Sequence, residues 1–89
     1  IRDINPQAPV HVLIMPLEHI PSIAAMGESN GALLGHIVQV ANHLAAAEGI
    51  AERGYRLITN HGPDSGQAVL HLHFHLLGGR FLGHLCSSA

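Results

Sequence analysis

The most informative part of this sequence is Val69-Leu70-His71-Leu72-His73-Phe74-His75-Leu76-Leu77. Apolar residues and histidines alternate along it, and a period of two is typical of a β-strand with two different faces. We expect a strand over Val69–Leu77 that ends at Gly78-Gly79. Leu70, Leu72, Phe74 and Leu76 share one face and should pack under a helix. His71, His73 and His75 share the other face and should form a surface beside a glycine-rich loop.

The sequence outside this stretch predicts two more strands and one long helix. The β-branched runs Val10–Met15 and Tyr55–Thr59 have the composition of strands. The apolar i, i+3, i+4 pattern predicts a helix over Gly31–Ala51, with Ser29 or Asn30 as its N-cap. Antiparallel-looking strands around one long helix indicate an α+β fold.

The connecting segments are rich in turn-forming residues. Pro21–Ala25 predicts a turn or a short helical piece, residues 60–66 predict a loop, and Gly83–Ala89 predicts a short tail. We expect residues 1–89 to form a single domain. Because the chain begins at Ile1 in strand-like sequence and without Met, we also expect that a first strand of the natural protein is missing.

The composition excludes several classes of protein. Apolar residues make up 47% of the 89 residues, which is too many for an intrinsically disordered chain. Four arginines, no lysine and six acidic residues give a net charge of −2, which excludes a basic nucleic-acid binder. No apolar run reaches the roughly 18–20 residues of a membrane span, and no signal peptide is visible. The single Cys86 cannot form an internal disulfide, which fits a cytoplasmic protein, and we assign it no role.

The histidine face of the predicted strand has three interpretations, of which the first two use no nucleophile. A merely solvated face is disfavoured by the strict alternation beside a glycine-rich loop. A zinc site is possible for two neighbouring histidines about 6.6 Å apart, if a further ligand comes from elsewhere. His71 and His75 lie about 13 Å apart along a regular strand, so all three histidines cannot bind one ion without a bend.

The third interpretation is covalent catalysis. Unprotonated imidazole is a nucleophile at neutral pH, and His73 has an imidazole neighbour on each side. Gly62 and Gly66 can bring backbone N–H groups close to phosphate oxygens. This combination favours phosphoryl or nucleotidyl transfer, in which positioning and charge stabilisation dominate.

Residues 66–80, Gly-Gln-Ala-Val-Leu-His-Leu-His-Phe-His-Leu-Leu-Gly-Gly-Arg, resemble the signature of the histidine triad (HIT) superfamily. The flanking Gly-Gln and Gly-Gly-Arg resemble its Hint branch, the histidine triad nucleotide-binding proteins. Further similarity lies in Asp3–His11, in Pro16 with His19-Ile20, and in Gly54-Tyr55-Arg56 before a strand ending at Asn60. The resemblance covers nearly the whole chain.

The resemblance implies an antiparallel five-stranded sheet with one long and one short helix, paired as a homodimer into a ten-stranded sheet. It also implies hydrolysis of the P–N bond of purine nucleoside 5′-phosphoramidates, such as AMP-amine and aminoacyl-adenylate-like compounds. The expected partners are such AMP conjugates and a second copy of the chain, with no nucleic acid and no membrane. No cofactor is expected to be required, and any zinc binding is not expected to be catalytic.

The resemblance also assigns roles to individual residues. His73 matches the nucleophile, and His75 matches the residue that contacts the phosphate and the departing amine. His71 matches the residue that orients the nucleophile through its carbonyl, and His11 matches a fourth, supporting histidine. The residues that match the nucleotide-binding positions are Asp3 at the ribose, Ile4 beside the nucleoside, and Asn60, Gly66, Gln67 and Ala68 at the phosphate.

Several residues depart from the family pattern or stand outside it. Ala68 replaces a frequent serine, His61 replaces an often acidic residue, and the sequence after Arg80 differs from that of eukaryotic relatives. We expect Arg80 to form a structural ion pair rather than to bind phosphate, and His19 to make a structural contact. His36 and His43 are expected on the polar face of the helix or at a dimer interface.

Two other functions remain open from the sequence. One is a nucleotide-binding regulatory or scaffold protein, although all four histidines are intact. The other is a dinucleotide-polyphosphate hydrolase of the Fhit type, which the residues flanking the motif disfavour.

Overall fold

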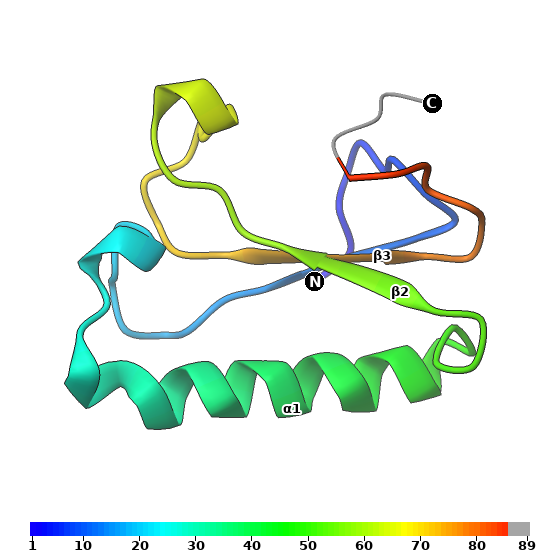
Figure 1. Ribbon diagram of the computed structural model, residues 1–89, viewed down its shortest axis with the longest axis horizontal. Helices are drawn as coiled ribbons and strands as arrows, with labels where there is room; N and C mark the ends of the chain where they lie inside the picture. The colour runs from blue at the N-terminus through cyan, green and yellow to red at the C-terminus, as the bar shows by residue number, and fades with distance from the viewer. Residues whose placement is uncertain (86–89) are drawn as a thin grey trace.

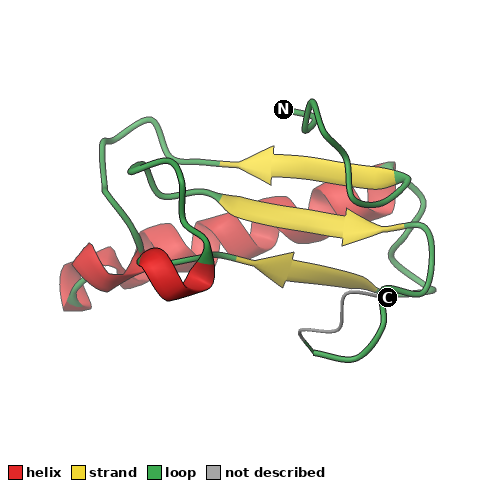
Figure 2. Ribbon diagram, turned by 90° about the horizontal axis from the view of Figure 1, so that it is seen from above, coloured by secondary structure: helices red, strands yellow, loops and turns green. Residues whose placement is uncertain are grey.

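A three-stranded antiparallel sheet and one long helix make up the fold of the computed structural model, which describes residues 1–85. The strands are β1 (Val10–Ile14), β2 (Tyr55–Ile58) and β3 (Phe74–Gly78), in the order β1-β3-β2. Helix α1 (Gly31–Ala47) runs along one face of the sheet (Figure 1). Figure 2 shows β3 in the centre, running opposite to both neighbours. The expected α+β class is therefore confirmed.

The core lies between α1 and the sheet. Its buried side chains come from β1, from β3 and from one stripe of α1, where Ile37, Ala41 and Ala45 repeat at a helical spacing of four. Phe74 and Leu76 of β3 face this layer. The prediction that the apolar face of the central strand packs under the helix is correct for these two residues.

The long helix ends earlier than the expected Ala51. Gly49 has a φ of +75°, a conformation that glycine adopts readily, and it reverses the chain directly after the C-cap. The Gly49 N–H donates to the Ala46 carbonyl and the Ile50 N–H to the Ala45 carbonyl, which is the Schellman pattern of helix termination. Ile50 is then buried against the core.

The central strand is shorter than the expected Val69–Leu77, and this prediction was wrong at its beginning. Strand β3 begins at Phe74, because β1 pairs with it only to Ile14 and β2 only to Ile58. Residues before Phe74 have no neighbouring strand, and Leu70, expected on the apolar face, is 70% exposed. His71 and His73 therefore precede the strand, and the regular-strand spacing does not apply to them.

The other two strands and the short segments differ less from expectation. Strands β1 and β2 each end one residue before the expected Met15 and Thr59. The segment around Pro21–Ala25 holds a 3-10 helix (Ile23–Ala25), a second one (Glu28–Asn30) precedes α1, and a third (Pro63–Ser65) lies in the predicted loop. Asn30 is the N-cap of α1, although its side chain accepts from the Gly27 N–H instead.

The face of the sheet opposite α1 carries the histidines. Register pairs His11 with Leu77 and Leu13 with His75, so these side chains share one face. The residues before β1 run beside it, with an isolated bridge between Arg2 and Val12. Within residues 1–85, no helix is both long and apolar enough to cross a membrane. Cys86 and the end of the predicted tail lie outside the described residues.

Candidate active site

His73 lies just before β3, and its ring is held by the main chain. Its Nδ1 lies 2.7 Å from the carbonyl oxygen of His71, which can only accept, so Nδ1 carries the proton. The neutral ring then has its lone pair on Nε2, the atom that a nucleophilic imidazole uses. The Thr59 hydroxyl donates to the His73 carbonyl at 2.7 Å and holds the segment where the ladder to β2 has ended.

The ring of His71 points away from the other two histidines of the motif. Its Nε2 donates to the Pro16 carbonyl at 3.0 Å, which leaves Nδ1 to accept from Nδ1 of His19 at 3.3 Å. The expected structural contact of His19 is therefore with this ring. His71 meets His73 through its carbonyl, which is the relationship expected for it.

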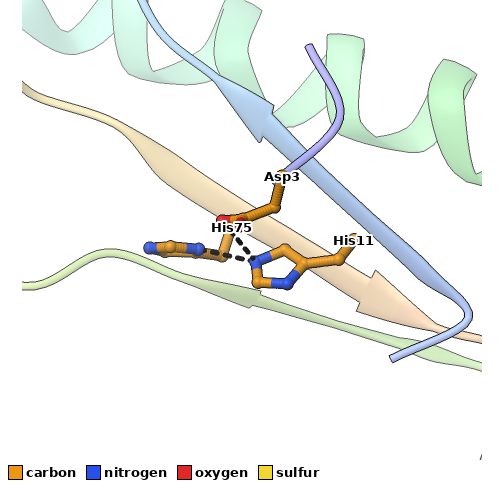
Figure 3. Close-up of side chains that lie close together, drawn as sticks. All are labelled: Asp3, His11 and His75. Atoms are coloured by element: carbon orange, nitrogen blue, oxygen red, sulfur yellow. Dashed lines mark hydrogen bonds and ion pairs between the residues drawn. The ribbon is translucent and has the colours of Figure 1, made fainter. Parts of the chain in front are cut away.

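His75, His11 and Asp3 form a second group, shown in Figure 3. His75 comes from β3, the buried His11 from β1, and Asp3 from the segment before β1. Nε2 of His11 lies 2.8 Å from Nδ1 of His75 and 3.5 Å from a carboxylate oxygen of Asp3. The rings of His73 and His75 lie edge to face with their centroids 5.2 Å apart, so this group is in contact with His73.

A backbone group fixes the proton positions in this second group. The Gln7 N–H donates to Nδ1 of His11 at 3.0 Å, so the neutral His11 ring carries its proton on Nε2. That proton is donated to Nδ1 of His75, with Asp3 as a more distant acceptor. His75 in turn carries its own proton on Nε2, at the far side of the ring from His11 (Figure 3).

The pKa of His75 is lowered from its ordinary value of 6.5. Burial is the largest cause, because it disfavours the charged ring, and the neighbouring His11 and His73 lower the pKa further. The Asp3 carboxylate acts in the opposite direction. His75 is therefore neutral at neutral pH and acts there as a hydrogen-bond donor.

Asp3, His11 and His75 also offer three possible metal ligands, whose atoms lie within 4.8 Å of one another. The hydrogen-bond pattern does not fit a metal ion. An ion on Nε2 of His11 would require the ring proton on Nδ1, where it would face the Gln7 N–H. Metal-bound histidines instead donate their other N–H to an acceptor. The sequence also allowed a metal site between two neighbouring histidines of a regular strand. His71 and His73 do not have that arrangement, because the His71 ring turns toward Pro16.

The loop between β2 and His71 is fixed by its own polar groups. The Gln67 side chain accepts from the Gly62 N–H and donates to the carbonyls of Pro21 and Val69. Gly66 adopts a φ of +84° and its N–H is used within the loop. By contrast, the N–H of the exposed Ala68 donates to no group among residues 1–85. Asn60 lies half-buried at the start of the loop.

The remaining expected site residues lie around these groups. Asp3 is half-buried and accepts from the Asn5 N–H at 2.8 Å, which leaves its second oxygen toward His11. Ile4 is 92% exposed beside it. Nδ1 of His61 lies 2.7 Å from the hydroxyl oxygen of the buried Ser22, and this hydrogen bond ties the loop to the first 3-10 helix.

Sequence reasoning missed several residues that shape the site. Thr59, Pro16 and Gln7 act through one hydroxyl or one backbone group, and no residue pattern marks such a role. The prediction that Arg80 forms an ion pair is wrong for the described residues. Its guanidinium instead donates to the backbone carbonyls of Gln7 and Phe81. His36 and His43 are exposed on α1, as expected for its polar face.

Comparison with known proteins gives consistent matches. The sequence model of the HIT domain family matches residues 1–82. The purine nucleoside phosphoramidase of Escherichia coli K12 is 51% identical over 82 residues, covering 92% of this chain and 69% of that protein. An uncharacterised HIT-like protein of Synechococcus elongatus is 49% identical over 81 residues, covering 91% and 70%. Among solved structures, a HIT family hydrolase from Clostridium thermocellum superposes with a TM-score of 0.91 at 55% identity, covering 97% of this chain and 75% of that one.

Proposed function

Because the chain belongs to the HIT domain family, we propose that it is a nucleotide hydrolase that cleaves the P–N bond of purine nucleoside 5′-phosphoramidates. The hydrolase class is supported by the similarity to a HIT family hydrolase and to a purine nucleoside phosphoramidase. The observation that carries the proposal is the hydrogen bond from Nδ1 of His73 to the His71 carbonyl, because it leaves Nε2 as a free nucleophile.

The reaction proceeds in two displacements at one phosphorus atom. Nε2 of His73 forms a bond to phosphorus while the P–N bond breaks, and the electron pair of that bond stays on the amine nitrogen. The amine takes up a proton from solvent as it leaves, and the Nε2–H of the neutral His75 hydrogen-bonds to the departing nitrogen while the P–N bond breaks. Water then attacks phosphorus, breaks the bond to His73 and releases AMP.

Nucleotide binding rests on groups at both ends of the site. The second carboxylate oxygen of Asp3 lies 3.5 Å from Nε2 of His11 and can also accept from the ribose, and the exposed Ile4 can contact the nucleoside. At the phosphate, the N–H of Ala68 has no partner among residues 1–85 and can donate to a phosphate oxygen. Ala68 has no side-chain hydroxyl, so the main chain supplies the contact. Gln67, whose side chain amide is engaged, supports the loop.

No metal takes part in this mechanism. The proposal is supported by the proton on Nε2 of His11, which occupies the atom that an ion in this group would need. His71 is turned away toward Pro16 and cannot complete such a site with His73.

The working form is a homodimer in which the sheets of two copies join edge to edge, and the three strands described in each copy form part of a ten-stranded sheet. Strand β2 is at the edge of the sheet, and its free edge can pair with a second copy. Val38 of α1 is 41% exposed, and Tyr55 at the start of β2 contacts Asn42, one turn beyond Val38. An apolar helix flank thus lies beside the open edge of the sheet.

Turnover of two substrates tests the proposed function. Adenosine 5′-phosphoramidate should be hydrolysed to AMP at least a hundred-fold faster than a diadenosine polyphosphate at equal concentration. Preference for the dinucleotide would indicate the Fhit type of activity instead. Tight AMP binding with turnover of neither substrate would indicate a nucleotide-binding regulator.

A further inference from the structure

The main chain of Gln7 is held at both of its polar groups. Its N–H donates to Nδ1 of His11 at 3.0 Å, and its carbonyl accepts from the Arg80 guanidinium at 2.7 Å. Arg80 is 73 residues away along the chain and lies just after β3. Its other terminal nitrogen donates to the Phe81 carbonyl at 2.8 Å, which fixes the direction of the guanidinium.

The turn after β3 packs directly against the segment before β1. Gly79 has a φ of +95°, and a Cβ atom at this position would come within 3.0 Å of Cβ of Pro9. This close approach brings Arg80 within reach of Gln7. The contact is therefore part of how two distant segments meet, beside the group of Asp3, His11 and His75.

A continuous series of hydrogen bonds runs from Arg80 to the proposed leaving-group donor. The Gln7 N–H requires the neutral His11 ring to carry its proton on Nε2, and that proton is donated to Nδ1 of His75 at 2.8 Å. His75 must then carry its own proton on Nε2. If the Gln7 N–H moved away, His11 could carry its proton on either nitrogen, and the direction of donation to His75 would no longer be fixed.

We propose that Arg80 is a positioning residue, which acts through the main chain of Gln7 and through His11 to keep the Nε2–H of His75 directed at the leaving group. This inference rests on the proposed function and deepens it. Arg80 touches neither the substrate nor the reacting atoms. Its removal should affect the step in which the amine departs, and it should leave nucleotide binding nearly unchanged.

The test compares two leaving groups in Arg80→Leu. The first substrate is an AMP alkylamide, whose departing nitrogen needs a proton. The second is adenosine 5′-(p-nitrophenyl phosphate), whose leaving group, p-nitrophenolate, needs no proton. We expect kcat for the alkylamide to fall at least ten-fold, kcat for the nitrophenyl ester to change less than two-fold, and AMP affinity to change less than two-fold. Arg80→Lys, which keeps one donor for the Gln7 carbonyl, should recover part of the loss.

Arg53→Leu is the matched control. Arg53 lines the same surface cavity of about 510 Å³ as Arg80, and it donates no hydrogen bond among residues 1–85. Its removal deletes an equal charge from the same region and should leave the ratio of the two rates unchanged. Equal losses for both substrates in Arg80→Leu, with weakened AMP binding, would mean that Arg80 binds phosphate and would overturn the proposal.

A spectroscopic measurement tests the proposal without turnover, and its wild-type part does not depend on any variant. Long-range ¹H–¹⁵N spectra report which ring nitrogen of His75 and of His11 carries the proton. In the wild-type protein both rings should show protonated Nε2, and Arg80→Leu should reduce that population. Protonated Nδ1 on His75 in the wild type would overturn the inference at once. A wild-type protein with the expected spectra but no phosphoramidate turnover would contradict the proposed function instead.

Discussion

Nε2 of His11 lies 2.8 Å from Nδ1 of His75, and this contact joins β1 to β3 at the centre of the histidine group. Both rings are neutral in this arrangement, since one nitrogen donates and the other accepts. The contact explains how His11, far from His75 in sequence, comes to lie in the candidate site. It also means that a change in the protonation of either ring disturbs the other.

The titration of His75 should have its midpoint below pH 6.5. Burial is the main reason, and His11 and His73 add to it, because each disfavours a charged ring at this position. Asp3→Asn should lower the pKa further, since the carboxylate raises it. Asp64→Asn, in an exposed loop, should leave it unchanged. The pH dependence of the His75 ring carbon resonances, followed by NMR, gives the midpoint in the wild type and in both variants. A wild-type midpoint above 6.5 would contradict the lowered pKa of His75.

The surroundings of Gly78 predict a stability difference between two glycine substitutions. A Cβ atom at Gly78 would lie 2.7 Å from Cδ1 and 3.1 Å from Cβ of Ile50, so Gly78→Ala should lower the free energy of unfolding by about 1–3 kcal/mol. Gly35→Ala, inside α1 with nothing within 4 Å, should raise it by about 0.5–1 kcal/mol. Urea unfolding measures both. Equal stability of the two variants would show that Ile50 is not packed on β3 as described.

How much of this arrangement is predictable from sequence differs between the core and the site. The alternation with histidines correctly predicts that Leu72, Phe74 and Leu76 are buried, because burial follows the local period, but it is wrong for the exposed Leu70. The alternation does not predict that β3 begins at Phe74. A strand extends only where partners lie beside it, and the ends of β1 and β2 at Ile14 and Ile58 are set elsewhere in the chain.

The hydrogen bonds of the site are harder to predict than its residue types. The motif indicates His73 as the candidate nucleophile, and its contact with His71 is local, two residues away. The bond from Gln7 to His11 uses a backbone N–H, which every residue except proline has. The contact between His19 and His71 spans 52 residues and depends on how the loop after β1 returns to the sheet. Such contacts require the fold to be known first.

Chelation should leave turnover unchanged. EDTA or 1,10-phenanthroline at millimolar concentration should alter the hydrolysis of adenosine phosphoramidate less than two-fold, because the Gln7 N–H keeps Nε2 of His11 protonated and unavailable to an ion. Activity assays before and after dialysis against the chelator test this. Complete loss of activity, restored by zinc but not by magnesium, would show that the metal interpretation of the histidine group is correct.

Sedimentation at micromolar concentration should give twice the chain mass of 9.4 kDa. Val38→Glu should shift the equilibrium toward the monomer, because it places a charge on the exposed apolar flank of α1 beside β2. His36→Glu is the control, since two residues along a helix turn the side chain by about 200°, to another flank. A wild-type sample that sediments only as a 9–10 kDa species would contradict the dimer.

Trapping the covalent intermediate shows whether Nε2 of His73 is the nucleophile. The enzyme is mixed with an AMP amide labelled at phosphorus and quenched in alkali during turnover, because the bond between phosphorus and imidazole is labile in acid. We predict label on His73 within the Val69–Arg80 segment and none in His73→Ala. The kcat/KM of this variant should fall roughly a thousand-fold or more, which corresponds to a loss of several kcal/mol of transition-state stabilisation. Label on another residue, or near-normal turnover by His73→Ala, would contradict the account.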